Sequence, residues 1–153
     1  MALALYSLFK GDFMSYLEWF EAHARKHEAI MQTLTHLNDN EVIDYFNYEN
    51  MQKNHPDFCP LYEQNKKCHE MTELNCYFCA CMHFRFSDQG LAKEGEHTRY
   101  SLCSIHAKES KDFVAQKAIH LDCSNCYIPH KKSVIQKYFS RSWREIMAKT
   151  VSN

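Results

Sequence analysis

Glycine and proline are scarce in this chain of 153 residues, which contains only three of each. Because tight turns draw heavily on these two residue types, their scarcity disfavours a turn-rich all-β fold. The chain also has almost no net charge, since its formal value is −1, and this disfavours nucleic acid or a membrane surface as the main partner. Long apolar runs are missing as well, so we expect no membrane span.

The apolar N-terminal stretch ends at Lys10 and has no basic residue before it. It is too short for a signal peptide, so we expect a soluble, cytoplasmic protein. Hydrophobic residues make up 45% of the chain, which indicates a folded domain rather than a disordered chain. In the reducing cytoplasm, a count of eight cysteines favours metal or redox chemistry over the alternative of a disulfide framework.

The cysteines divide the chain, because all of them lie between Cys59 and Cys126. We predict an N-terminal helical hairpin over residues 1–58 and a cysteine-rich metal-binding domain over residues 59–153, joined as one compact unit. Residues 1–58 carry nine acidic and four basic side chains, whereas residues 131–153 carry six basic and one acidic. The opposite charges predict that these two segments face each other.

The N-terminal hairpin is predicted from an apolar stripe and from capping signals. Asp12 can cap the first helix, and a second helix is expected to begin at Asn38, where Glu41 completes a capping-box pattern. The short link between the helices predicts an antiparallel pair. The stripe repeats at helical spacing and comprises Phe13, Leu17, Phe20, Ala24, His27, Met31 and Leu34. We interpret His27 as a packed histidine rather than a metal ligand.

A C-terminal helix is expected to begin just after Pro129. Its apolar positions are Val134, Ile135, Tyr138, Phe139, Trp143, Ile146 and Met147. Its basic residues would suit a membrane surface, but packing of the aromatic face on the core is the favoured interpretation. Together these patterns predict a mostly α fold with an irregular, metal-bound, cysteine-rich centre and short strands.

Two pairs of cysteines have the C-x2-C spacing of a metal knuckle, in which a tight turn brings two thiolates to one ion at about 2.3 Å. The first pair is Cys76 and Cys79, and the second is Cys123 and Cys126. Two such pairs in one cytosolic chain are a much stronger signal than either pair alone. Cys81 follows the first pair at an alternate position that points away, so we expect it to serve a different ion.

Eight thiols divide into two sets of four, and zinc is the default ion for closed tetrahedral thiolate sites. We assign Cys59, Cys68, Cys76 and Cys79 to the first set, and Cys81, Cys103, Cys123 and Cys126 to the second. His69, His106 and His130 are alternative ligands, or donors of hydrogen bonds to the ligands. An iron–sulfur cluster is the rival to zinc, although the C-x2-C-x-C run lacks the usual bacterial ferredoxin spacing.

Other readings of the knuckles are disfavoured. Ala80 and Tyr127 stand where haem c attachment requires histidine, and no βαβ pattern supports a thioredoxin-like pair. Two closed sites favour a structural or binding module, whereas His106, His130 or Glu70 beside an incomplete site would favour a metalloenzyme. No phosphate-binding loop or HExxH motif is present, and the sequence leaves enzyme status open.

Residues 58–138 resemble the cysteine-rich small domain family of bacteria and archaea. The matching motifs are Cys59 in FCPLY, Cys68-His69, Asn75-Cys76-x2-Cys79-x-Cys81, Cys103, and Asp122-Cys123-Ser124-x-Cys126-x2-Pro129-His130. The chain departs from the family at Lys67, where proline is frequent, and at Ser104 and Ile105, where glycines are common. The resemblance implies metal binding in a domain of unassigned role. It also implies a link to corrinoid metabolism, because some members are fused to an amidohydrolase of cobinamide salvage.

Overall fold

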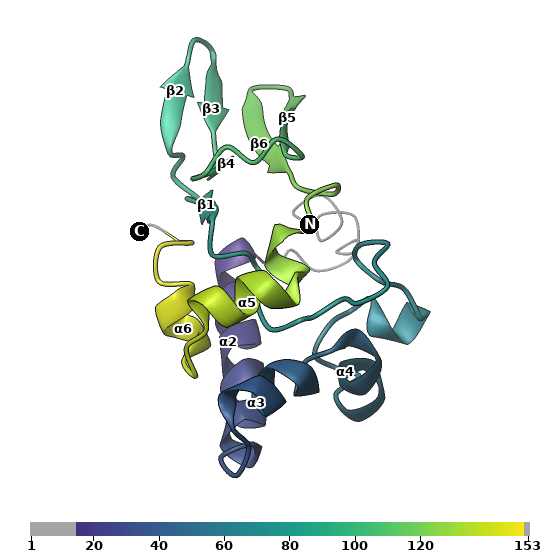
Figure 1. Ribbon diagram of the computed structural model, residues 1–153. Helices are drawn as coiled ribbons and strands as arrows, with labels where there is room; N and C mark the ends of the chain where they lie inside the picture. The colour runs from purple at the N-terminus through teal and green to yellow at the C-terminus, as the bar shows by residue number, and fades with distance from the viewer. Residues whose placement is uncertain (1–14, 152–153) are drawn as a thin grey trace. The chain divides into compact units, whose positions relative to one another are not determined.

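The computed structural model describes residues 15–151, drawn in colour in Figure 1. The structure is 36% helical and 18% strand, with two small sheets and five α-helices in the described residues, so the expectation of a mostly α fold is wrong. The chain forms two compact units. One, the helical unit, comprises Ser15–Cys79 and Tyr127–Ile146. The other, the strand unit, comprises Ala80–Cys126 and residues 147–151. The sequence-based boundary at residue 58 falls inside the helical unit.

The helical unit begins with α2, which spans Tyr16–Thr33. Its N-terminus is closed by a capping box, in which the Ser15 hydroxyl accepts a hydrogen bond from the Glu18 amide at 3.1 Å and the Glu18 carboxylate accepts from the Ser15 amide at 2.7 Å. The expected cap at Asp12 and the first stripe residue, Phe13, lie outside the described residues.

Two short helices follow α2. The first, α3, spans Asp39–Tyr45 and begins with the predicted capping box of Asn38 and Glu41. The second, α4, spans Tyr48–Asn54 and was not predicted. The Asn47 side chain caps α4 by accepting a hydrogen bond from the Asn50 amide at 2.9 Å. Asparagine is a strong N-cap residue, so two caps nine positions apart divide one polar stretch into two helices.

The C-terminal segment forms two helices where one was expected. These are α5, Lys132–Tyr138, and α6, Trp143–Ile146. Phe139 has an extended backbone, with φ −60° and ψ 133°, which ends α5. The Ser142 hydroxyl then accepts a hydrogen bond from the Glu145 amide at 3.3 Å and caps α6. No helix in the described part of the chain has both the length and the apolar character needed to cross a bilayer.

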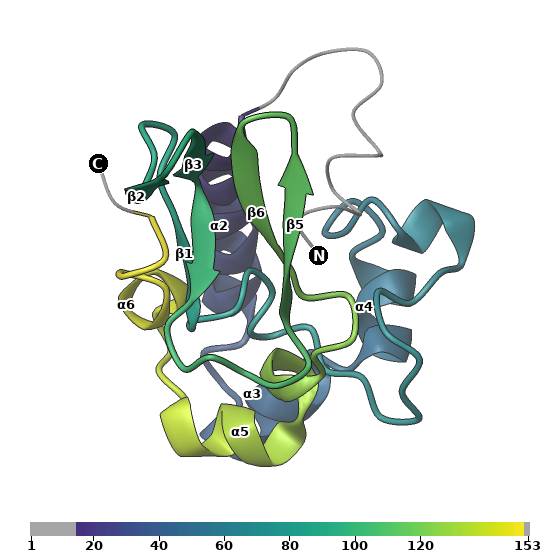
Figure 2. The same ribbon diagram turned by 90° about the horizontal axis from the view of Figure 1, so that it is seen from above.

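The C-terminal helices pack on the N-terminal ones, α6 against α2 and α5 against α3 (Figure 2). Ion pairs between basic side chains of the tail and acidic side chains of the N-terminal segment accompany this packing. Arg144 contacts Glu21 at 2.9 Å and Glu28 at 3.1 Å. Arg141 contacts Asp39 at 2.8 Å. The prediction that the acidic N-terminal segment and the basic tail face each other is therefore confirmed.

An aromatic cluster at the centre of the helical unit encloses two histidines of α2. The His27 ring centroid lies 4.7 Å from that of Phe46 and 4.6 Å from that of Tyr77. His23 lies 5.2 Å from Trp143. His27 is completely buried and neither of its ring nitrogens has a hydrogen-bond partner among the described residues. The interpretation of His27 as a packed residue is confirmed.

The strand unit contains two sheets. Strands β1 (Phe84–Phe86) and β4 (Ser101–Cys103) form an antiparallel pair. A four-stranded sheet has the order β2-β3-β6-β5, from Ala92–Glu94, His97–Arg99, Ala118–Asp122 and Lys111–Ala115. The β3–β6 pair is parallel and the other two pairs are antiparallel. In β6, Ile119 and Leu121 are buried on alternate positions.

Turn geometry explains why the strands were underestimated. Gly90 and Gly95 have φ values of +87° and +62°, so two of the scarce glycines serve turns of this unit. The turn between β5 and β6 uses Gln116 in the left-handed region, at φ 54°. Because a non-glycine residue supplies this turn, the low glycine count was a misleading signal against strands.

Candidate metal centre

Three metal-ligating side chains of the helical unit converge on one point. The ligand atoms of Cys68, His69 and His130 all lie within 4.8 Å of one another. The His69 Nδ1 atom is 3.2 Å from the Cys68 sulfur, and the His130 Nε2 atom is 3.6 Å from the same sulfur. His69 and His130 are almost fully buried, and Cys68 is half-buried. The arrangement offers one sulfur and two nitrogen donors to a single ion.

A 3₁₀ turn brings His130 to this group. The turn, η2, spans Ile128–His130 and contains Pro129 at its start, where the fixed φ of proline suits a helical turn and no amide hydrogen is needed. The His130 amide donates to the Tyr127 carbonyl at 3.0 Å and closes the turn. The closing Tyr-Ile-Pro-His sequence therefore presents its histidine toward Cys68, which precedes it by 62 positions.

Asn75 orients the His130 ring. The His130 Nδ1 atom lies 2.9 Å from the Asn75 carbonyl oxygen. Because a carbonyl only accepts hydrogen bonds, Nδ1 carries the ring proton and the Nε2 lone pair faces the Cys68 sulfur. Histidines that ligate metals almost always donate their other ring nitrogen in this way.

The Asn75 side chain is itself held on both ends. Its amide nitrogen donates to the Ile43 carbonyl at 2.6 Å, and its oxygen accepts from the Tyr77 amide at 2.9 Å. These bonds fix the segment that enters the first knuckle. The Cys76 amide also donates to the Phe46 carbonyl at 2.8 Å, so the knuckle is anchored to the end of α3.

Burial sets the protonation of the ligands. It lowers the pKa of His130 to about 4, against a smaller opposing effect of the hydrogen bond to Asn75, so the ring is neutral near pH 7. Burial raises the pKa of Cys68 to about 12, and the neighbouring Cys59 adds to the increase. Burial also raises the pKa of Cys76, and the nearby thiols of Cys68 and Cys59 add to the increase. Such crowded thiols ionise when a bound cation neutralises them.

The other cysteine of the first set, Cys79, completes the knuckle turn. Its amide donates to the Cys76 carbonyl at 3.2 Å, and its own carbonyl accepts from the Trp143 indole at 3.2 Å. Cys59, Cys68, Cys76 and Cys79 all belong to the helical unit, together with His69 and His130.

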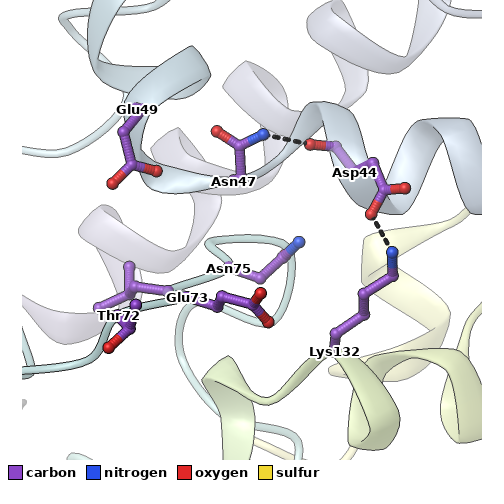
Figure 3. A pocket seen from close by; sticks show the side chains of 8 residues that line it. Asp44, Asn47, Glu49, Thr72, Glu73, Asn75 and Lys132 are labelled. Atoms are coloured by element: carbon purple, nitrogen blue, oxygen red, sulfur yellow. Dashed lines mark hydrogen bonds and ion pairs between the residues drawn. The ribbon is translucent and has the colours of Figure 1, made fainter.

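A polar cavity of about 280 Å³ adjoins this segment of the helical unit. It is lined by Asp44, Asn47, Glu49, Thr72, Glu73, Leu74, Asn75 and Lys132. Figure 3 shows the carboxylates of Asp44, Glu49 and Glu73 around it, with Lys132 paired to Asp44. The cavity therefore borders Asn75, the residue that orients His130.

The second predicted set, Cys81, Cys103, Cys123 and Cys126, lies wholly in the strand unit. Burial raises the pKa of Cys81 to about 11, and Cys126 and Cys103 contribute to the rise. Burial likewise raises the pKa of Cys123 to about 12, with contributions from the same set. In the part of the chain that the structure describes, however, no three of these four sulfurs lie within 4.8 Å of one another. The first four cysteines share the helical unit and these four share the strand unit. Both the assignment to two ions and ligation itself stay predictions.

Backbone geometry in the strand unit suits cysteine turns. Ala80 and Cys81 have φ values of 85° and 56°, in the left-handed region. The Ala107 amide donates to the Cys103 sulfur at 3.4 Å, and the Cys126 amide donates to the Cys123 carbonyl at 2.9 Å. His106, whose φ is 48°, lies exposed on the turn after Cys103 and is not part of the Cys68 group.

Sequence reasoning missed the role of Tyr62 beside Cys76, as it missed the role of Asn75 beside His130. Tyr62 has a buried hydroxyl, which donates to the Cys76 sulfur at 3.1 Å. Its place three residues after Cys59 was the only signal, and no spacing rule assigns a tyrosine to such a role.

Comparison of the chain with protein-family models, curated proteins and solved structures gives no match. The resemblance to the cysteine-rich small domain family therefore stays a prediction.

Proposed function

We propose that this protein binds metal ions, with zinc favoured, through one cysteine-rich set in each unit. The observation that carries the proposal is the convergence of Cys68, His69 and His130, whose ligand atoms lie within 4.8 Å of one another. None of the eight cysteines, all of which lie within residues 15–151, forms a disulfide, so each sulfur can serve as a metal ligand.

The donor chemistry supports zinc in the helical unit. Zinc accepts thiolate sulfur and neutral imidazole nitrogen in tetrahedral sites, and both donor types meet at Cys68. The same unit contains three further candidate ligands, the thiols of Cys59, Cys76 and Cys79. The segment between η1 (Tyr62–Gln64) and the first knuckle is irregular and contains no helix or strand. An ion that neutralises the thiolates would hold this segment in place. We therefore assign a structural or binding-module role.

A metalloenzyme is the second candidate, and the same group of three ligands favours it. Catalytic zinc sites keep three protein ligands and leave a fourth position for water or substrate. One sulfur and two nitrogens from Cys68, His69 and His130 would satisfy that count without the other cysteines. An iron–sulfur cluster is the alternative for the all-cysteine set of the strand unit.

Metal analysis of protein purified without oxygen tests the proposal. We expect native mass spectrometry and elemental analysis to find about two ions per chain, and Cys68→Ser to lose about one of them. His36→Ala, a change at an exposed histidine, is the matched control and should keep both ions. A folded, metal-free wild-type chain would contradict the proposal. Visible charge-transfer bands with bound iron would favour the cluster instead.

A further inference from the structure

The hydroxyl group of Tyr62 is buried against a cysteine sulfur. Tyr62 is 4% exposed and Cys76 is 7% exposed, and the hydroxyl oxygen lies 3.1 Å from the sulfur, to which it donates. This bond joins two side chains 14 positions apart in the helical unit, and Cys76 belongs to the first set of ligands assigned from the sequence.

The Tyr62 ring has little freedom to place this hydroxyl elsewhere. Its backbone amide donates to the Cys59 carbonyl at 3.0 Å, and its carbonyl accepts from the Gln52 side chain at 3.2 Å. The ring packs edge-on to Tyr48 at 5.5 Å and stacks with Phe58 at 6.5 Å. Backbone bonds and ring packing therefore aim the hydroxyl at Cys76.

We infer that Tyr62 is a positioning residue of the metal centre, whose hydroxyl proton stabilises the Cys76 thiolate and tunes its bond to the ion. The inference rests on the proposed function, because it assigns Cys76 to the metal. A donor facing a thiolate in a buried site withdraws negative charge from the sulfur and fixes its orientation.

Replacing the hydroxyl alone separates this role from simple packing. Tyr62→Phe keeps the ring and removes only the donor. We expect it to weaken metal binding about 10- to 100-fold, as is typical when an outer-shell partner of a ligand is lost. In cobalt-substituted protein, the sulfur-to-cobalt charge-transfer band should move to lower energy, because the sulfur is no longer stabilised by a proton donor.

Tyr48→Phe is the matched control. Tyr48 is also buried, at 6% exposed, and touches Tyr62, but its hydroxyl donates to no cysteine among the described residues. Tyr48→Phe should leave both the metal affinity and the cobalt band at the wild-type values. Chelator competition and absorption spectra of the full chain measure the two effects.

A second perturbation covers the case in which Tyr62→Phe fails to fold. Biosynthetic replacement of tyrosine by 3-fluorotyrosine makes the phenol a stronger donor and leaves packing almost unchanged. The cobalt band should then move to higher energy, opposite to the shift in Tyr62→Phe. If wild-type protein binds metal while neither perturbation alters affinity or spectrum, the role of Tyr62 is overturned. If wild-type protein binds no metal, the proposed function itself fails.

Discussion

His130 and Asn75 hold each other by two hydrogen bonds. The His130 ring nitrogen Nδ1 lies 2.9 Å from the backbone carbonyl oxygen of Asn75. The backbone amide of Asn75 donates in turn to the backbone carbonyl of His130 at 3.3 Å. These bonds span 55 positions of the sequence. The orientation of the proposed ligand is therefore set by the protein before any ion binds, which reduces the ordering that binding must supply.

We expect His130→Ala to lose about one ion per chain, because His130 supplies one of three converging donors. His106→Ala is the control, since His106 lies exposed in the other unit. His130→Gln, which keeps more of the buried volume, separates loss of a ligand from loss of packing. Metal content and melting temperature of the three variants provide the measurement. Full metal occupancy in His130→Ala would exclude this histidine as a ligand.

Asn75→Asp should destabilise the helical unit although the side chain keeps its shape. The carboxylate can still accept from the Tyr77 amide, but it places an oxygen opposite the Ile43 carbonyl, where the amide nitrogen now donates. Leaving that buried carbonyl without a donor costs about 1–3 kcal/mol of unfolding free energy.

Denaturant unfolding measures this loss, with Asn40→Asp as the control on an exposed position of α3. Asn40→Asp should unfold at nearly the wild-type midpoint. Equal midpoints for the two variants would show that the Asn75 amide does not stabilise the fold.

The two glycines of the strand unit provide a matched pair. A Cβ atom at Gly90 would lie 2.5 Å from the Thr98 Cγ2 atom, whereas one at Gly95 would meet nothing within 4 Å. Both residues have positive φ, so each alanine variant carries a backbone strain of about 1–2 kcal/mol.

Gly90→Ala should lose roughly a further 1–3 kcal/mol because the new methyl group overpacks the contact with Thr98. Urea unfolding followed by a probe in the strand unit compares the two variants. A Gly95→Ala protein less stable than Gly90→Ala would refute the contact as the source of the difference.

Acid should destabilise the helical unit through His23 and His27. Burial lowers the pKa of each from 6.5 to about 3, so the folded chain leaves them neutral where the unfolded chain protonates them. The unfolding free energy therefore keeps its full value above pH 6.5 and falls as the pH drops toward 3. The loss approaches about 1.4 kcal/mol per pH unit for each histidine.

The test is a series of denaturant titrations between pH 7 and pH 4. His23→Phe keeps an aromatic ring beside Trp19 and Trp143 and removes one titrating group. Its stability should fall less steeply with acid than that of wild type. Parallel curves for the two proteins would mean that His23 does not contribute to the acid sensitivity.

Local signals were sufficient to predict the start of α3. The capping box of Asn38 and Glu41 was legible because both residues lie within one turn. The division of the tail into two helices at Phe139 could not be predicted, because the helical spacing of apolar residues continues through the break. Only Ser142 marks the start of α6. Periodicity over short strands such as β1, with three residues, is too weak to identify them.

Prediction of the site had the same limit. Cysteine spacing indicated which residues were candidates, and the thiols of each predicted set lie in one unit. The choice among His69, His106 and His130 depended on a contact across 62 positions, which spacing does not encode. The roles of Asn75 and Tyr62 were hidden for the same reason, because each acts through a tertiary hydrogen bond.

The packing of α6 on α2 has a consequence for synthesis on the ribosome. Arg144 and its partner Glu21 are 123 positions apart. At about 5–20 residues per second, the apolar face of α2 waits on the order of 10 s for the tail that covers it. During that interval α2 is a nascent amphipathic helix without its native cover, and therefore a target for ribosome-associated chaperones.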